Sequence, residues 1–207
     1  GNLTVLHSIL VTDSERIQID SLALIAKDAP GNQSLDVITP FVSLGIHGQY
    51  TLTQLGNVFQ QAINPYFALS TKKDTAKVNP YHFNITGSVV NSPVLRSFIP
   101  KLTQLKPILL AGNFSSDSGW NVSLTSPHIV YGTMLIDSAN FIAATQNGSL
   151  AFNTSLRHFT SGTSFKIFAT RLSGTLATSG WRKTSTGASP VCCALAIKYS
   201  SAAAPKA

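Results

Sequence analysis

The side chains in this sequence that could catalyse a reaction or bind a metal ion are few and far apart. Asp20 and Asp137 could form the carboxylate pair of a sugar hydrolase, but each lies near the start of a predicted strand, where a turn or edge role is more typical. Cys192 and Cys193 are adjacent, so they cannot crosslink distant parts of a fold and make a poor zinc site. None of the five histidines has a second histidine or a carboxylate at metal-ligand spacing; they are His7, His47, His82, His128 and His158.

Known catalytic motifs are also missing. The chain contains no Gly-x-Ser-x-Gly elbow, no phosphate-binding Walker loop and no dinucleotide fingerprint. We therefore predict no catalytic residue, no cofactor, no metal site and no enzymatic activity. A hydrolase of the β-sandwich type is a third possibility for the chain, but its acid–base residues are not assembled anywhere in the sequence.

The net charge of +7 does not indicate a nucleic-acid partner. Arg182, Lys183, Lys198 and Lys206 follow Leu176 in a stretch without acidic residues, and the balance up to Leu176 is 11 minus 8, or +3. The other basic residues are mostly scattered, whereas nucleic acid is bound by clustered Lys and Arg, often with aromatic residues between them. Only 11% of the residues are charged, against roughly 25% in a typical soluble domain. Ser, Thr and Asn supply most of the polarity, which suits extended sheets.

The stretch 109–156 has the clearest pattern in the sequence. We therefore expect its structure to position the functional surface of the protein. Apolar residues alternate with small polar ones, which predicts strands with one dry and one wet face. Asn147-Gly148 separates two such runs and predicts a tight hairpin. A break is expected at Ser126-Pro127. The alternating apolar residues include Trp120, Val122, Leu124, Phe141, Leu150, Phe152 and Leu156.

Two segments have the period of a helix instead. Apolar residues recur at spacings of three and four between Leu52 and Tyr66, which predicts an amphipathic helix that must dock on the sheet. Ser92-Pro93 has the form of an N-cap followed by proline at the first helical position, and Pro100 ends that shorter helix. The predicted fold class is therefore mainly β: a long, curled antiparallel meander, forming a groove-like sheet, with one or two short amphipathic helices.

The pattern weakens after Leu176. Residues 1–176 are predicted to be the β-groove segment of a longer envelope protein, and residues 177–207 a low-complexity or non-native tail that is disordered. The chain begins with Gly1, which is the basis for reading it as a piece of a longer protein.

The predicted sheet has more apolar surface than two short helices can cover. Such a face must fold on itself or bind something apolar. If it is open, it predicts a groove; the alternative is that the same residues fill the core of a closed sandwich. The candidate groove residues are Trp120, Val122, Leu124, Phe141, Leu150, Phe152, Phe165 and Ile167.

The order of the elements between Leu3 and Leu176 resembles that of a known family. It is similar to the TamB-type translocation and assembly module proteins of the AsmA-like superfamily, particularly the large versions found in Bacteroidota. The residues that carry the resemblance are Gly48-Gln49-Tyr50-Thr51-Leu52 entering a helix that ends near Tyr66-Phe67, Phe83-Asn84-Ile85, Asn91-Ser92-Pro93-Val94-Leu95, Phe98-Ile99-Pro100, Gly112-Asn113-Phe114 and Ile136-Asp137-Ser138.

The resemblance implies an internal segment of a long protein that is anchored in the inner membrane of bacteria and reaches across the periplasm. It implies a trough with an apolar interior that acts in outer-membrane protein assembly or secretion, or in phospholipid transport between membranes. The partners implied are phospholipid acyl chains or unfolded outer-membrane protein strands, with an outer-membrane barrel as a further possible partner. The rival from another class is a surface adhesin or passenger-type β module that binds protein or glycan.

Overall fold

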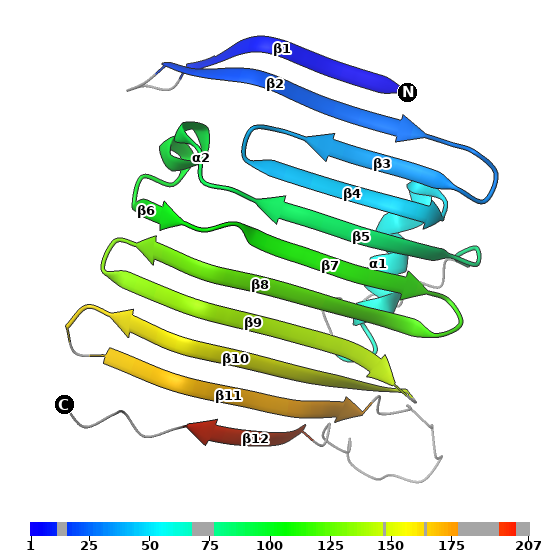
Figure 1. The fold of residues 1–207 in the computed structure, drawn as a ribbon. Coiled ribbons are helices and arrows are strands. Elements are labelled where there is room, and N and C mark those ends of the chain that lie inside the picture. The colour runs from blue at the N-terminus through cyan, green and yellow to red at the C-terminus, as the bar shows by residue number, and fades with distance from the viewer. Residues whose placement is uncertain (12–15, 68–76, 147, 164, 178–194, 202–207) are drawn as a thin grey trace, which may run out of the picture.

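The protein folds as one long antiparallel sheet in which strand follows strand. The computed structural model describes residues 1–11, 16–67, 77–146, 148–163, 165–177 and 195–201. Twelve strands form the sheet in the order β1-β2-β3-β4-β5-β7-β8-β9-β10-β11-β12, with β6 paired to β8 beside this path (Figure 1). The predicted fold class, a mainly β curled meander with short helices, is confirmed.

The longest strands of the meander are β8 to β11, each of thirteen residues. The strands are β1 (Asn2–Val11), β2 (Arg16–Lys27), β3 (Gln33–Ile38), β4 (Val42–Gln49), β5 (His82–Val89), β6 (Leu102–Leu105), β7 (Ile108–Ser115), β8 (Gly119–Tyr131), β9 (Met134–Gln146), β10 (Ser149–Ser161), β11 (Phe165–Ala177) and β12 (Leu195–Ser201).

The predicted hairpin joins β9 to β10. Gln146 and Ser149 are cross-strand partners, so only two residues connect the strands. Gly148 has φ 72°, the left-handed conformation that this turn needs. Asn147 lies outside the described residues.

The helices lie where the sequence predicted them. The first segment contains a 3₁₀ turn (η1, Leu52–Gln54) and α1 (Leu55–Ile63). The second is α2 (Pro93–Phe98), whose N-terminus is capped by Ser92 Oγ accepting from the Leu95 N–H at 3.0 Å. Among the described residues, no helix is long and apolar enough to span a membrane.

The core lies between α1 and the middle of the sheet. Leu55, Val58 and Ala62 are the buried residues of α1. They pack over strands β4, β5 and β7, where Phe83 is fully buried. The buried partners on these strands and the loop after β4 are Ile46, Tyr50, Phe83, Ile85 and Phe114.

The predicted break at Ser126-Pro127 is wrong, because β8 continues through it to Tyr131. Proline is tolerated because the ladder has a gap there: the register runs from Ser126–Ala139 to His128–Asp137 and leaves out Pro127 and Ser138. The same gap continues into the next two strand pairs, at Arg157 and Ala169. We call this line of four residues, Pro127, Ser138, Arg157 and Ala169, the crease.

The predicted tail lies largely outside the described residues. The part that the structure describes is β12, whose backbone pairs with β11 from Thr170–Ser201 to Leu176–Leu195. The rest of 178–207, with Cys192 and Cys193, is outside the described residues.

Candidate apolar surface

One apolar row runs across the sheet from β1 to β11, with one residue on each strand except β6. Successive members are direct cross-strand partners, so their side chains share a face of the sheet. We call this set the apolar row. It consists of Leu3, Leu24, Val37, Leu44, Gly87, Leu110, Leu124, Phe141, Thr154 and Leu172.

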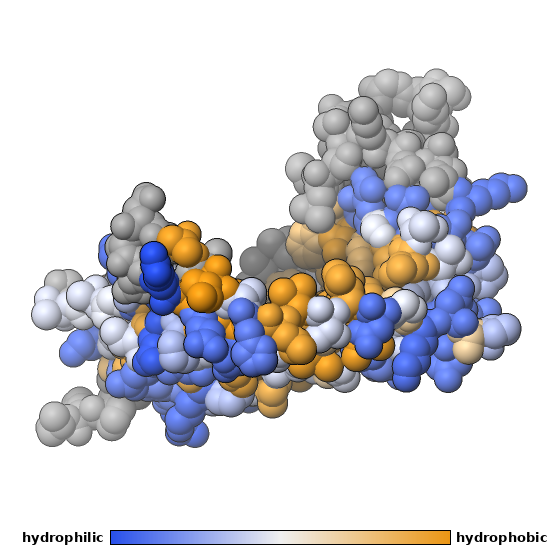
Figure 2. Space-filling model, turned by 90° about the horizontal axis from the view of Figure 1, so that it is seen from above, coloured by the Kyte–Doolittle hydropathy of each residue, from blue (hydrophilic) through white to orange (hydrophobic). Residues whose placement is uncertain are grey.

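The apolar row contains no charged residue and stays accessible along its length. Leu124 is 39% exposed and Phe141 is 36% exposed, and the other members are half-buried apart from the exposed Leu3. Thr154 is its one polar member. Figure 2 views the molecule along the sheet from the β1 side and shows hydrophobic residues gathered over the middle, with a hollow between two raised parts.

The neighbouring positions on the opposite face are mostly polar. Ser43 and Ser88 hydroxyls lie 3.0 Å apart, and Thr125 Oγ1 donates to Asn140 Oδ1 at 2.7 Å. This difference follows from the alternation of the strands, since each residue next to a member of the apolar row points to the other face. The sheet is therefore amphipathic over nearly its whole length.

A second apolar row runs parallel to the first and is partly covered by α1. It contains Ile46, Ile85, Val122, Ala143 and Phe152 as successive partners, with Gly112 between Ile85 and Val122. Ile46, Ile85 and Ala143 are buried. The helix therefore forms one side of a trough whose open floor is the apolar row.

An aromatic stack fixes α1 on the sheet. Phe83 stacks on Phe114 with ring centroids 5.3 Å apart, and Phe114 stacks on Trp120 at 6.1 Å. Trp120 Nε1 donates to the carbonyl of Ala62 at 2.9 Å, which satisfies an acceptor at the C-terminal end of α1. Phe59 of α1 meets Phe114 edge-on at 5.1 Å.

The structure divides the eight candidate groove residues into three groups. Leu124 and Phe141 are partners in the open apolar row. Trp120 and Val122 pack against the core below α1, Leu150 is buried and Phe152 is half-buried in the second row, so these four are not on the open floor. Phe165 and Ile167 lie beyond the crease, paired with Ser161 and Phe159, and are not brought to the other six.

Six open members of the apolar row were missed by the sequence reasoning. Leu3, Leu24, Val37, Leu44 and Leu110 lie on β1, β2, β3, β4 and β7, and the sequence pattern gave no register between these strands. Leu172 lies on β11 and was not among the candidate residues. A register is needed to line these residues up, and register depends on cross-strand pairing.

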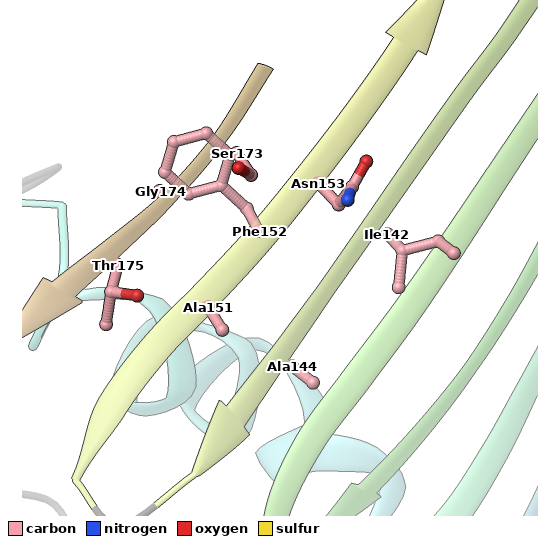
Figure 3. A pocket seen from close by; sticks show the side chains of 8 residues that line it. All are labelled: Ile142, Ala144, Ala151, Phe152, Asn153, Ser173, Gly174 and Thr175. Atoms are coloured by element: carbon pink, nitrogen blue, oxygen red, sulfur yellow. The ribbon is translucent and has the colours of Figure 1, made fainter. Parts of the chain in front are cut away.

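The opposite face carries a shallow hollow of about 480 Å³ on β9, β10 and β11 (Figure 3). Small side chains at Ala144 and Ala151 leave the space, and Ile142 and Asn153 border it. It opens broadly to solvent, and nothing among the described residues indicates a ligand for it.

The titratable residues are dispersed over the sheet. His47 Nε2 lies 2.9 Å from Asp36 Oδ1, in a space that a Cβ at Gly45 would fill. His128 Nδ1 lies 3.6 Å from Asp137 Oδ1. Within the described ranges, no group of three His, Cys, Asp or Glu residues is placed to hold a metal ion.

The postulated carboxylate pair is not formed. Asp20 and Asp137 are inside strands β2 and β9, not at strand starts, with β3, β4, β5, β7 and β8 between them in the sheet. A distance of several strands is too long for the two carboxylates of a glycosidase, which lie within roughly 10 Å of each other.

The comparisons with known proteins identify no relative. No protein-family model, no curated protein and no solved structure matches the chain.

Proposed function

We propose that the chain is a non-enzymatic segment of a TamB-like envelope protein and that the apolar row is the floor of a trough for apolar cargo. The cargo is phospholipid acyl chains or unfolded outer-membrane protein strands. The observation that supports the proposal is the apolar row, in which Thr154 is the one polar member, on an accessible face of a single open sheet. A closed sandwich would need a second layer over this row, and the described residues form one sheet only.

The dimensions of the apolar row suit acyl chains. It crosses ten strands, so nine spacings of about 4.8 Å make it roughly 43 Å long. A bilayer has a hydrocarbon core of about 30 Å, so the chains of one leaflet span roughly half that. The row is therefore long enough for more than one acyl chain placed end to end.

The chemistry of the apolar row needs no fixed binding residue. Each methylene buried against an apolar wall contributes about 0.8 kcal/mol without directional contacts. A repeated wall of Leu, Val and Phe can therefore hold a chain at many positions along its length, as a conduit requires. In this proposal the segment works in the periplasm, in outer-membrane protein assembly or in phospholipid transport between the two membranes.

Lipid extraction from the purified chain, followed by mass spectrometry, tests the proposal directly. Co-purifying phospholipid is the expected result. Binding is then measured by titrating a fluorescent fatty acid into the lipid-free protein. The double variant Leu124→Glu/Phe141→Glu should bind the probe at least tenfold more weakly, because an unpaired charge against an acyl chain costs well over the 1.4 kcal/mol of one tenfold step.

The matched control is Leu109→Glu/Ile142→Glu, which places the same two charges on the opposite face. Leu109 and Ile142 are 51% and 56% exposed. Ile142 follows Phe141 in the sequence, and Leu109 is the cross-strand partner of Thr125, the residue after Leu124. The control should bind the probe as the wild type does. Absence of lipid together with equal probe binding by both variants would reject the trough and favour the adhesin.

A further inference from the structure

The crease interrupts three adjacent strand pairs at one place. Pro127, Ser138, Arg157 and Ala169 would be consecutive partners in the ladder, and none of these pairs is formed. The register is the same on both sides, so the strands do not slip past each other there. The backbone is also interrupted at this level on the neighbouring strand, where β6 ends at Leu105 and β7 begins at Ile108.

The crease holds strained backbone. Ser138 has φ 53° and Ala169 has φ 45°, the left-handed region that residues with a Cβ rarely adopt. Both lie inside strands of thirteen residues, where an extended conformation would be the ordinary one. This conformation of the sheet therefore has a local cost at two positions of the same line.

Two buried polar atoms beside the crease have no hydrogen-bond partner among the described residues. They are Ser126 Oγ, next to Pro127, and His158 Nε2, next to Arg157. A buried polar atom without a partner is unfavourable. The left-handed backbone and these two polar atoms both raise the free energy of this conformation, so a second conformation with a different angle at the crease is expected to compete with it.

The crease is parallel to the apolar row. Leu124, Phe141, Thr154 and Leu172 are each three residues from the crease residue of their own strand, or about 10 Å along it. A change of angle at the crease would therefore move the parts of β8 to β11 beyond it relative to Leu124, Phe141, Thr154 and Leu172.

We propose that the crease is a hinge between two panels of the sheet. One panel carries the apolar row and α1; the other consists of β6 and the parts of β8 to β11 beyond the crease. Motion of the second panel changes how far the trough is open, a role that rests on the proposed function. The hinge itself does not depend on cargo.

Distance measurement between spin labels tests the hinge in the chain without lipid. Cys192→Ser and Cys193→Ser remove the native thiols, and Ile142→Cys and Phe165→Cys place one label on each panel. Both positions are more than half exposed. We expect two populated distances, one of them that of the present structure.

The variant Ala169→Gly removes the Cβ that disfavours the left-handed backbone. It should raise the ratio of the structure's distance to the other distance by about tenfold. The control Ala151→Gly lies on β10, where the ladder is intact on both sides, and should leave the ratio unchanged.

A single distance in all proteins would overturn the hinge and leave a fixed bend. The hinge would also be overturned if Ala169→Gly left the ratio of the two distances unchanged, or if Ala151→Gly changed it equally. In either case strain at the crease would not control the motion. The measurement needs no lipid, so the hinge stands if two distances and the shift are found but lipid binding fails.

Discussion

The fully buried Phe83 gives the most direct test of how α1 is held over the sheet. It has 0% exposure at the centre of the core, and four rings surround it. The ring centroids of its neighbours lie 5.3 Å to 6.0 Å away; these neighbours are Phe114, Tyr50, Tyr81 and Phe59. We predict that Phe83→Ala removes a large part of the stability of the protein.

The size of the effect follows from the cavity that the substitution leaves. Replacing a buried phenylalanine with alanine costs about 3–5 kcal/mol, because apolar contacts are lost and the surroundings collapse only in part. A value near the upper end is expected here, since the rigid aromatic neighbours are not able to fill the space. The total stability of a domain is about 5–15 kcal/mol, so the variant would be marginally folded.

Urea unfolding followed by far-ultraviolet circular dichroism measures this loss. The midpoint should fall while the slope with urea stays constant. Phe98→Ala is the matched control, because Phe98 is 57% exposed on α2, and its free energy of unfolding should change by less than about 0.5 kcal/mol. A loss below about 1.5 kcal/mol for Phe83→Ala would refute the view that this ring is the centre of a rigid core.

Two further predictions concern α2 and the loop after β4. Ser92→Ala removes the cap of α2 and should lower the free energy of unfolding by about 1 kcal/mol, whereas Ser92→Thr, which keeps the hydroxyl, should recover most of it; equal losses in urea unfolding would contradict the capping role. Burial, and then the charges of Asp36 and Asp28, raise the pKa of Tyr50 above its usual value of 10. The folded state therefore holds this proton more tightly than the unfolded state, and stability falls as the pH rises above 10. Tyr50→Phe should make that fall less steep, as measured by urea unfolding at pH 8 and pH 10.5; an unchanged pH dependence would show that Tyr50 does not contribute.

Local sequence patterns were sufficient to predict the apolar face of a strand and the start of a helix. The alternation at Trp120, Val122 and Leu124 predicted a strand with one apolar face, because the two faces of a strand repeat every second residue. Ser92-Pro93 predicted a helix start through local hydrogen bonding alone. Both features depend on neighbours in the sequence, and both are present in the structure.

The sequence did not predict which apolar residues α1 covers. Trp120 and Leu124 have the same parity and similar hydrophobicity, yet Trp120 packs below α1 and Leu124 remains open. The difference comes from where α1 docks, which is set by the aromatic stack of three strands. Phe165 was grouped with Phe141 because both are apolar residues in alternating runs, although the crease places them on different panels.

The sequence by itself determined an amphipathic antiparallel meander, since alternation, turn residues and caps act over a few residues. Tertiary structure alone decided the register that aligns Leu3 through Leu172 into one row, the part of that face hidden by α1, and the crease. These depend on pairing between residues far apart in the chain, and no local pattern encodes which partner a strand position meets.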